Sequence, residues 1–599
     1  MLKIFTLVCA LAGLLTAVLL EAWLRSRVVR NETSAGAYAE VKSRYSEFWS
    51  IQYGPLAIML VLIGTVLFFF VGHINAAVFI GGAVLCFVSV IAGSSTLVTG
   101  SIAPSSTAVT GDMRTALKTS YRSASVMGLL ISSIALVGLG VLFFILDTEQ
   151  LVRLVASFAL GASVVSLCLG ISGNAFSGAY SITVRSDDFT DYSGMFVGSG
   201  ADHVETYILS ACSAALLAEV GVSTSSYIAT FSASSAAAFP VIIFAAGIIA
   251  SIPGIMSYRG RIAKNPAAGL TAGNFVAAVI IIALTFYFSN RMLQSYIYAI
   301  CVSIGIAAAL VSGEFAKPYS ADGVIFRRYL PDIKKAGTSQ TMIYSLSIGM
   351  ISVIIPAVLT TAAMMVAYRF ASFYGIALAA VGINSMAAVN SAVRGFSINT
   401  ASASDIASVS DPDAESPNAA DVLLTASART DAIGKTYSAI GTYVTLVAMF
   451  TALSVVANNN STNLLSMTVY LGIMIGAVVI FVCAGLIIRS IRLTSQVLGN
   501  RLKDSDDPEK RIASLRGLFP IYVISLLVPL VPGAFGGVNG LIAFACSASV
   551  TGMCVIFAFN NSGRFYERTA TETLGTVIKL MVAVTLVFAP VFMKLEGLF

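Results

Sequence analysis

The chain has 599 residues, of which 57% are hydrophobic and 11% are charged, and its formal net charge is +6. A soluble domain carries about 25% charged residues, so this composition excludes an ordinary water-soluble enzyme and indicates a protein whose main solvent is lipid. The positive balance does not call for nucleic acid as a partner, because the cytoplasmic loops of membrane proteins are rich in lysine and arginine.

Sixteen segments are apolar over the roughly 20 residues that a helix needs to cross a bilayer. In chain order they are 2–24, 54–72, 75–99, 121–146, 151–180, 202–221, 226–254, 271–289, 295–313, 342–367, 371–392, 435–457, 463–488, 517–533, 536–559 and 575–595. The sequence therefore predicts an all-α, multi-pass integral membrane protein of about sixteen helices, with residues 1–599 forming one polytopic domain. We interpret the first segment as a membrane helix, because its apolar run is too long for a cleaved signal peptide.

The loops between these segments alternate in charge. Counted from the first helix, the odd connections hold most of the loop lysines and arginines, whereas the even ones hold little beyond Arg153, Arg291 and Arg369. Positive loops stay in the cytoplasm, so both termini are predicted to lie outside or in a lumen. Several odd loops are also long, among them 393–434 and 489–516, and we expect them to build a cytoplasmic face.

Cysteine, histidine and phosphate-loop patterns give no soluble-enzyme signature. The eight cysteines lie in or beside apolar runs without a CxxC pair, and the chain has two histidines, His73 and His203. No cysteine or histidine metal cluster is therefore predicted. Residues 429–436 end like a phosphate loop, but Arg429 stands where the first glycine is required.

Three ionisable residues fall within predicted membrane helices. A charge at the bilayer centre costs about 2.5–3.5 kcal/mol on insertion scales, so such residues usually face a protein interior and have a function. Asp202 and Glu205 are spaced i and i+3 and share one helix face, and Lys579 lies in the last helix. A lysine between two carboxylates would form either a switchable ion gate or a static ion pair that ties helices together.

Asp187, Asp188 and Asp191 precede the sixth segment on the predicted cytoplasmic side. Carboxylates four residues apart lie on one face of a helix and can hold Mg²⁺ through oxygen. The alternative is an acidic loop that is simply solvated.

Several blocks of this sequence resemble the membrane-bound inorganic pyrophosphatases. They are GSGADHVETY at 198–207, GIIASI at 247–252, YGIALAAVG at 374–382, AIGK at 432–435, IKLM at 578–581 and LVFAP at 586–590. The resemblance spans nearly the whole chain. It implies a sixteen-helix ion pump that hydrolyses pyrophosphate at its cytoplasmic face, where aspartates hold Mg²⁺ ions. It also implies a homodimer in the lipid bilayer, and a subunit of a larger membrane complex is a further possibility for this chain.

At the positions of the family's ion gate, this chain has the same residue types as the family. Asp202, Glu205 and Lys579 fall where the family has its membrane aspartate, glutamate and lysine. The family's coupling arginine in the fifth helix, however, is Leu169.

At the hydrolytic positions the family's acids are largely replaced. Ser181 and Arg185 stand where it has aspartates, and of its three-aspartate ladder Asp187 and Asp191 remain as candidate metal ligands while the third is Met195.

Replacement continues after the eleventh helix. Ser391 and Ile398 occupy two carboxylate positions before Asn399, whereas Asp421 survives and Lys435 lies in a matching block. These positions therefore outline a degenerate site.

Three interpretations follow from this pattern. Losing one key catalytic group costs about 10²–10³ in rate, and several are replaced, so we expect a catalytically inactive, pyrophosphatase-like membrane protein that keeps the scaffold and the gate. It would be a structural or ion-translocating component rather than an enzyme. The second interpretation is an active, Mg²⁺-dependent, pyrophosphate-energised H⁺ or Na⁺ pump, and the third is a membrane sensor of a phosphorylated anion that binds through the substituted arginines.

Overall fold

The computed structural model describes residues 2–26, 32–109, 112–146, 148–183, 191–224, 233–258, 266–319, 338–410, 418–457, 466–501, 518–560 and 565–596. Within these ranges the chain is helical and contains no strand. The first half holds α1 (Leu2–Arg25), α2 (Glu32–Phe70), α3 (His73–Ser94), α4 (Leu97–Val109), α5 (Met113–Ile145), α6 (Thr148–Thr183), α7 (Ser193–Thr224), α8 (Ala233–Met256), α9 (Pro266–Leu293) and α10 (Ile297–Ala316). The second half holds the short η2 (Lys317–Tyr319), α12 (Thr338–Ser352), α13 (Ile354–Ser385), α14 (Ala387–Ser410), α15 (Asn418–Val456), α16 (Met467–Arg501), α18 (Phe519–Leu527), the short η3 (Val528–Leu530), α19 (Val531–Asn560) and α20 (Phe565–Glu596).

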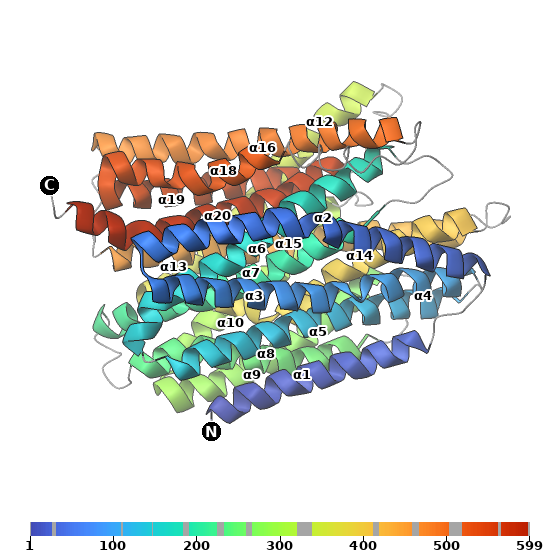
Figure 1. The fold of residues 1–599 in the computed structure, drawn as a ribbon. Coiled ribbons are helices and arrows are strands. Elements are labelled where there is room, and N and C mark those ends of the chain that lie inside the picture. Colours follow the sequence, from blue (N-terminus) through green and yellow to red (C-terminus); the bar gives the residue numbers. More distant parts are fainter. Residues whose placement is uncertain are drawn as a thin grey trace.

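The helices run roughly along one common direction and form a bundle (Figure 1). Helix α7 lies at its centre, where it packs against α6, α13, α15, α8, α14 and α20. Every described side chain from 192 to 218 is buried, as expected for a helix that is surrounded by others on all sides. The last helix, α20, packs against α6 and α7, which lie far earlier in the sequence.

Thirteen stretches of the described chain are long and apolar enough to span a membrane. Two of them, Leu346–Ser385 and Phe519–Asn560, each contain two of the predicted spans. The predicted sixth span lies in α7, which is not among the thirteen. Each of the sixteen predicted spans thus corresponds to a helical segment, and the prediction of an all-α multi-pass membrane protein is confirmed.

The helix boundaries differ from the predicted ones mainly on the side of the long loops. Residues 393–434 were expected to form a loop, but most of them belong to α14 and to the first part of α15. Likewise, residues 489–516 were counted among the long loops, but α16 continues past the predicted span 463–488 and ends at Arg501. The long odd connections are therefore largely helical where the structure describes them.

The two stretches that each correspond to two predicted spans, Leu346–Ser385 and Phe519–Asn560, reverse direction in the same way. Ser372 in α13 has φ 53° and ψ −144°, and Gly537 in α19 has φ 56° and ψ −148°. Three residues later in each case, a side chain at Gly375 or Gly540 would overlap the carbonyl oxygen of a residue eight positions earlier. In a straight helix eight residues span about 12 Å, so these close approaches show that each stretch turns back on itself.

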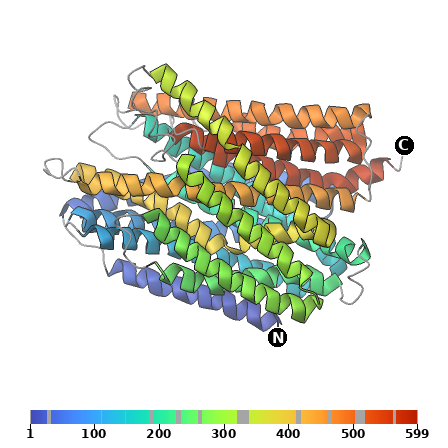
Figure 2. The ribbon, with the colours of Figure 1, turned by 180° about the vertical axis from the view of Figure 1, so that it is seen from behind.

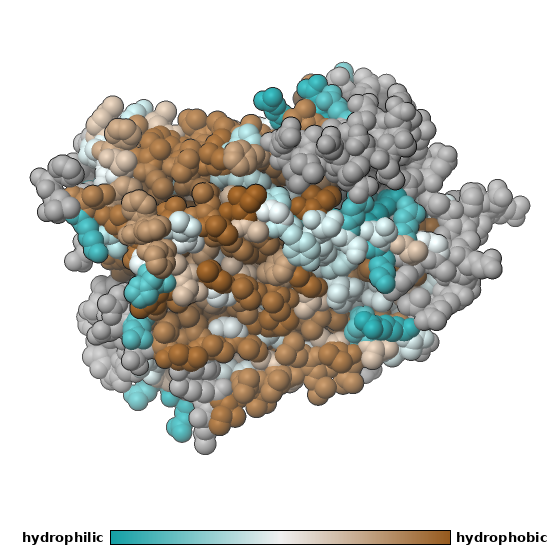
Figure 3. All heavy atoms as spheres, in the orientation of Figure 1, coloured by the Kyte–Doolittle hydropathy of each residue, from teal (hydrophilic) through white to brown (hydrophobic). Residues whose placement is uncertain are grey.

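The surface fits this membrane topology. Hydrophobic residues cover the middle of the bundle in Figure 3, and hydrophilic residues gather toward its two ends. Large apolar side chains such as Ile58, Phe69 and Phe481 are exposed, which is the expected state of a lipid-facing surface. The beginning of α1 and the end of α20 lie toward the same end of the bundle (Figures 1 and 2), as an even number of crossings requires.

Candidate functional site

The amino group of Lys579 lies between the two carboxylates of α7. Its Nζ is 2.6 Å from Asp202 Oδ1 and 3.0 Å from Glu205 Oε2, and it donates to Thr206 Oγ1 at 2.8 Å. Lys579 and Glu205 have no exposed surface, and Asp202 is 5% exposed. We name Asp202, Glu205 and Lys579 the gate cluster, and the structure brings together the three residues that the sequence singled out.

Local helix geometry explains why these side chains meet. Asp202, Glu205 and Thr206 are separated by three and four residues, so they project from one face of α7 toward α20. Thr206 donates its hydroxyl hydrogen to the carbonyl oxygen of Asp202 at 2.7 Å, which leaves its oxygen to accept from Lys579. The cluster is therefore built by two helices that lie far apart in sequence.

The gate cluster carries unbalanced charge. It contains one cation and two carboxylates, so it has one net negative charge when all three are ionised. Glu205 is ion-paired with Lys579, but neither of its carboxylate oxygens accepts a hydrogen bond of good geometry. A buried net charge is costly unless a further cation or proton compensates it, so this arrangement suits a site where a positive charge comes and goes.

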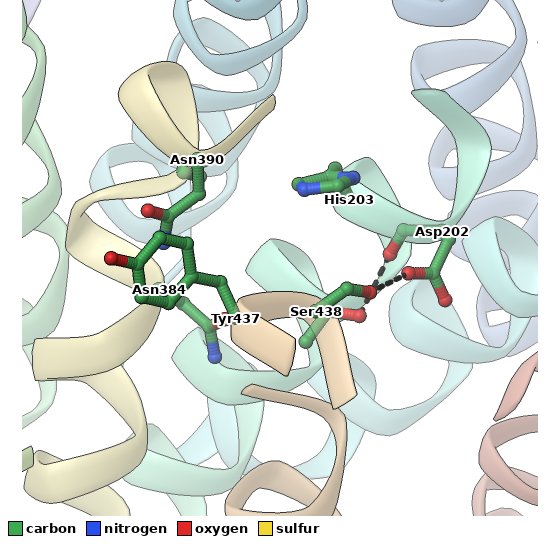
Figure 4. A pocket seen from close by; sticks show the side chains of 8 residues that line it. Asp202, His203, Asn384, Asn390, Tyr437 and Ser438 are labelled. Atoms are coloured by element: carbon green, nitrogen blue, oxygen red, sulfur yellow. Dashed lines mark hydrogen bonds between the residues drawn. The ribbon is translucent and has the colours of Figure 1, made fainter. Parts of the chain in front are cut away.

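Two small pockets flank Asp202, each with a cavity volume of about 20 Å³. One lies between α7, α13, α14 and α15 and is lined by neutral polar residues besides Asp202 (Figure 4). The other lies between α7, α15, α19 and α20 and includes Lys435 and Glu572. Ser438 of α15 belongs to both and donates to Asp202 Oδ2 at 2.5 Å.

The second pocket connects Asp202 with another buried group of charges. Arg394 of α14 is ion-paired with Asp431 of α15 and with Glu572 of α20. Lys435 Nζ lies 3.1 Å from Asp431 Oδ2, and Arg394 also donates to Ser397 Oγ at 3.4 Å. We name Arg394, Asp431, Lys435 and Glu572 the arginine network. It pairs two bases with two acids, so its formal charge is balanced within the protein.

The remaining predicted site residues are scattered or lie beyond the described ranges. Arg185 and Asp187 lie outside the described residues, and of Ser181 the structure describes only the backbone at the end of α6. Asp191 accepts a hydrogen bond from the backbone nitrogen of Ser193 at 2.8 Å, just before the first turn of α7. This hydrogen bond to the backbone gives Asp191 an ordinary structural role.

The positions after the eleventh span do not form a carboxylate site. Ser391 is buried and its hydroxyl has no partner. Asn399 is buried where α14 meets α4, close to Gly100. Asp421 is exposed in the first turn of α15.

The described residues do not fit the Mg²⁺ cage that the resemblance implied. No group of three or more His, Cys, Asp or Glu side chains in the described ranges is placed to hold a metal ion. The two acids of the arginine network, Asp431 and Glu572, are paired with Arg394 instead. Mg²⁺ needs near-octahedral oxygen ligation, and a guanidinium group at this place would repel it.

Sequence reasoning missed Asp431, Glu572, Ser438 and Thr206. A local signal existed for one of them, since Asp431 and Lys435 are four residues apart on one helix. Glu572 lies 178 residues from Arg394, and no sequence spacing predicts that contact.

The fold and this site define the class. The chain is a polytopic helical membrane protein with a lysine–carboxylate cluster buried between α7 and α20. Its sequence matches the family described as inorganic H⁺ pyrophosphatase over residues 11–183 and 181–504. The chain belongs to this family.

Named relatives are similar at low identity over most of their length. A putative K⁺-stimulated pyrophosphate-energized sodium pump of Clostridium tetani is 23% identical over 676 residues, which cover 99% of this chain and 98% of that protein. A K⁺-insensitive pyrophosphate-energized proton pump of Methanosarcina mazei is 23% identical over 577 residues, covering 88% and 84%. The K⁺-stimulated pyrophosphate-energized sodium pump of Thermotoga maritima is 23% identical over 406 residues, covering 57% and 55%.

Proposed function

We propose that this chain is a diverged member of its family that keeps an ion-translocating core but does not hydrolyse pyrophosphate. The observation that carries the proposal is the arginine network, in which Arg394 is bound to both Asp431 and Glu572. By resemblance, Arg394 lies between the positions of two family carboxylates, now Ser391 and Ile398.

The chemistry of hydrolysis explains why this arrangement argues against it. Phosphoryl transfer depends on cations that neutralise the phosphate oxygens and orient the attacking water. In the arginine network the acids are neutralised by protein cations, and the cations are held by protein acids. Each missing catalytic group costs about 10²–10³ in rate, so we expect hydrolysis to be negligible.

Two other functions compete with this one. An active pyrophosphate-energised pump is favoured by the assembled gate cluster and by the names of the relatives. A sensor of a phosphorylated anion is less well supported, because the guanidinium group of Arg394 already serves two carboxylates.

The test measures pyrophosphate hydrolysis and ion flux on the same reconstituted protein. Liposomes receive Mg²⁺, K⁺ and pyrophosphate, and the Thermotoga maritima sodium pump serves as the positive control. We expect no phosphate release above that of empty liposomes, together with an ion flux down an imposed gradient that Lys579→Ala reduces. Phosphate release at the rate of the control, abolished by Asp191→Ala, would show an active pump and overturn the proposal.

A further inference from the structure

The neutral polar pocket beside the gate cluster contains a histidine with no assigned role. We propose that His203 is a buried proton-binding site whose proton compensates the negative charge of the gate cluster. This inference rests on the proposed ion-translocating function, because it assigns a regulator to the same site. It is carried by the hydrogen bonds of the ring, by the pocket that the ring faces and by the charge balance around it.

The hydrogen bonds of the ring fix its tautomer. His203 Nδ1 lies 2.8 Å from the carbonyl oxygen of Ser199, one turn earlier on α7. A carbonyl oxygen can only accept, so Nδ1 carries the hydrogen and, in the neutral ring, Nε2 presents a lone pair. Nε2 is buried and no described group donates to it. A buried acceptor without a donor is rare in native proteins, so Nε2 is available for a proton or a water molecule.

The surroundings of the ring can supply that proton. His203 lines the pocket between α7, α13, α14 and α15, and its side chain is drawn there with Asn384, Asn390 and Tyr437 (Figure 4). The residue is 8% exposed. The pocket has a cavity volume of about 20 Å³, and a cavity needs about 10–15 Å³ to hold one water molecule, so one water molecule fits and can pass a proton to Nε2.

The charges around the pocket favour a proton at this position. Asp202 lines the same pocket, and through Lys579 it is linked to Glu205 in the gate cluster. The arginine network is balanced in itself, and Tyr437 is the other titratable residue of the lining. Burial and the cations Lys579 and Arg394 oppose an imidazolium ion, whereas the Asp202 carboxylate and the Ser199 carbonyl oxygen favour it. A proton on Nε2 would bring the gate cluster and His203 together to zero net charge.

This balance couples the proton to the gate. Lys579 now holds Asp202 Oδ1, and Ser438 holds Oδ2. An added positive charge on the neighbouring residue competes with Lys579 for the Asp202 carboxylate, because both cations draw on the same negative charge. Protonation of His203 therefore weakens the contact between α7 and α20, and its loss restores that contact.

The direct test uses the small number of histidines. The full-length protein, labelled with ¹⁵N-histidine, has two imidazole groups, and the variant His73→Asn leaves that of His203 as the single signal. We expect the neutral ring to carry its hydrogen on Nδ1 and to take up a second proton between about pH 5 and 8, the range in which histidine responds to its surroundings. A ring with its hydrogen on Nε2, or one that stays neutral down to about pH 4, would overturn the proposal.

The coupling has its own test in the same spectra. Glu205→Gln removes one negative charge from the gate cluster, so His203 should take up its proton at a pH lower by about one unit or more. Glu21→Gln, a change of the same kind in the distant helix α1, is the matched control and should leave the titration unchanged. Equal titrations of His203 in all three proteins would overturn the coupling.

Ion flux distinguishes a failure of this inference from a failure of the proposed function. His203→Asn keeps a donor for the Ser199 carbonyl but cannot take up a proton. We expect it to conduct like the parent protein at high pH and to lose the change in flux that the parent shows between about pH 5 and 8. Absence of flux in every protein, with a normal NMR titration, would count against the proposed function alone. A parent flux profile unchanged in His203→Asn would count against the role of His203.

Discussion

At the scale of single residues, Lys579 is a buried cation that depends on its partners for stability. Its ammonium group is fully buried and is held by Asp202, Glu205 and Thr206. Removal of one partner of a buried ion pair leaves the others without compensation and costs about 3–5 kcal/mol. We therefore predict that Lys579→Met, which keeps most of the side-chain length, lowers the free energy of unfolding in detergent by about that amount.

Two further variants show whether charge is the cause. Lys594→Met changes an exposed lysine of the same helix and should shift stability by less than about 0.5 kcal/mol. The triple variant Lys579→Met, Asp202→Asn, Glu205→Gln removes all three charges and should recover much of the loss, because it leaves no unpaired ion. A triple variant as unstable as Lys579→Met would assign the effect to packing instead.

At the scale of helices, the arginine network joins three elements. Arg394 on α14 is bound to Asp431 on α15 and to Glu572 on α20. We predict that Arg394→Met destabilises the protein by about 3–5 kcal/mol. Combined with Glu572→Gln, it should destabilise by less than the sum of the two single changes, with a coupling of about 0.5–3 kcal/mol in thermal or chemical unfolding. Arg369→Met, at an exposed position in α13, is the control, and strictly additive effects of the first pair would contradict the network.

How far the sequence predicts these helices depends on the interactions that stabilise each helix. The apolar spans followed from hydropathy alone, and the meeting of Asp202 and Glu205 with Lys579 followed from helix spacing together with the family resemblance. Helix α14 was largely missed because it is rich in serine, which is typical of loops, and is less hydrophobic than the membrane spans. Its hydroxyl groups bond within the bundle, as Thr400 does with the Phe396 carbonyl and Ser404 with the Ala420 carbonyl. The partners of Arg394 were missed because tertiary contacts, not local spacing, bring them together.

At the scale of the whole molecule, two lines of reasoning agree on topology. The alternation of charged loops predicts sixteen crossings with both termini outside or in a lumen. The structure places the beginning of α1 and the end of α20 toward one end of the bundle (Figure 1). The side of the bundle that faces the cytoplasm is predicted from the positive loops.

Cysteine labelling in intact cells tests that orientation. Lys594 lies near the end of α20, and Arg114 lies in the first turn of α5, which is predicted to begin on the cytoplasmic side. Both residues are exposed, so cysteines placed there should react in water. We predict that a membrane-impermeant maleimide labels Lys594→Cys in intact cells, whereas Arg114→Cys reacts only after the membrane is permeabilised. The parent protein measures background, and its buried native thiols, such as Cys168 and Cys212, should contribute little because a thiol reacts as its thiolate.

Labelling of Arg114→Cys alone in intact cells would invert the orientation, and it would move the arginine network to the outer face, where no cytoplasmic phosphate compound could reach it.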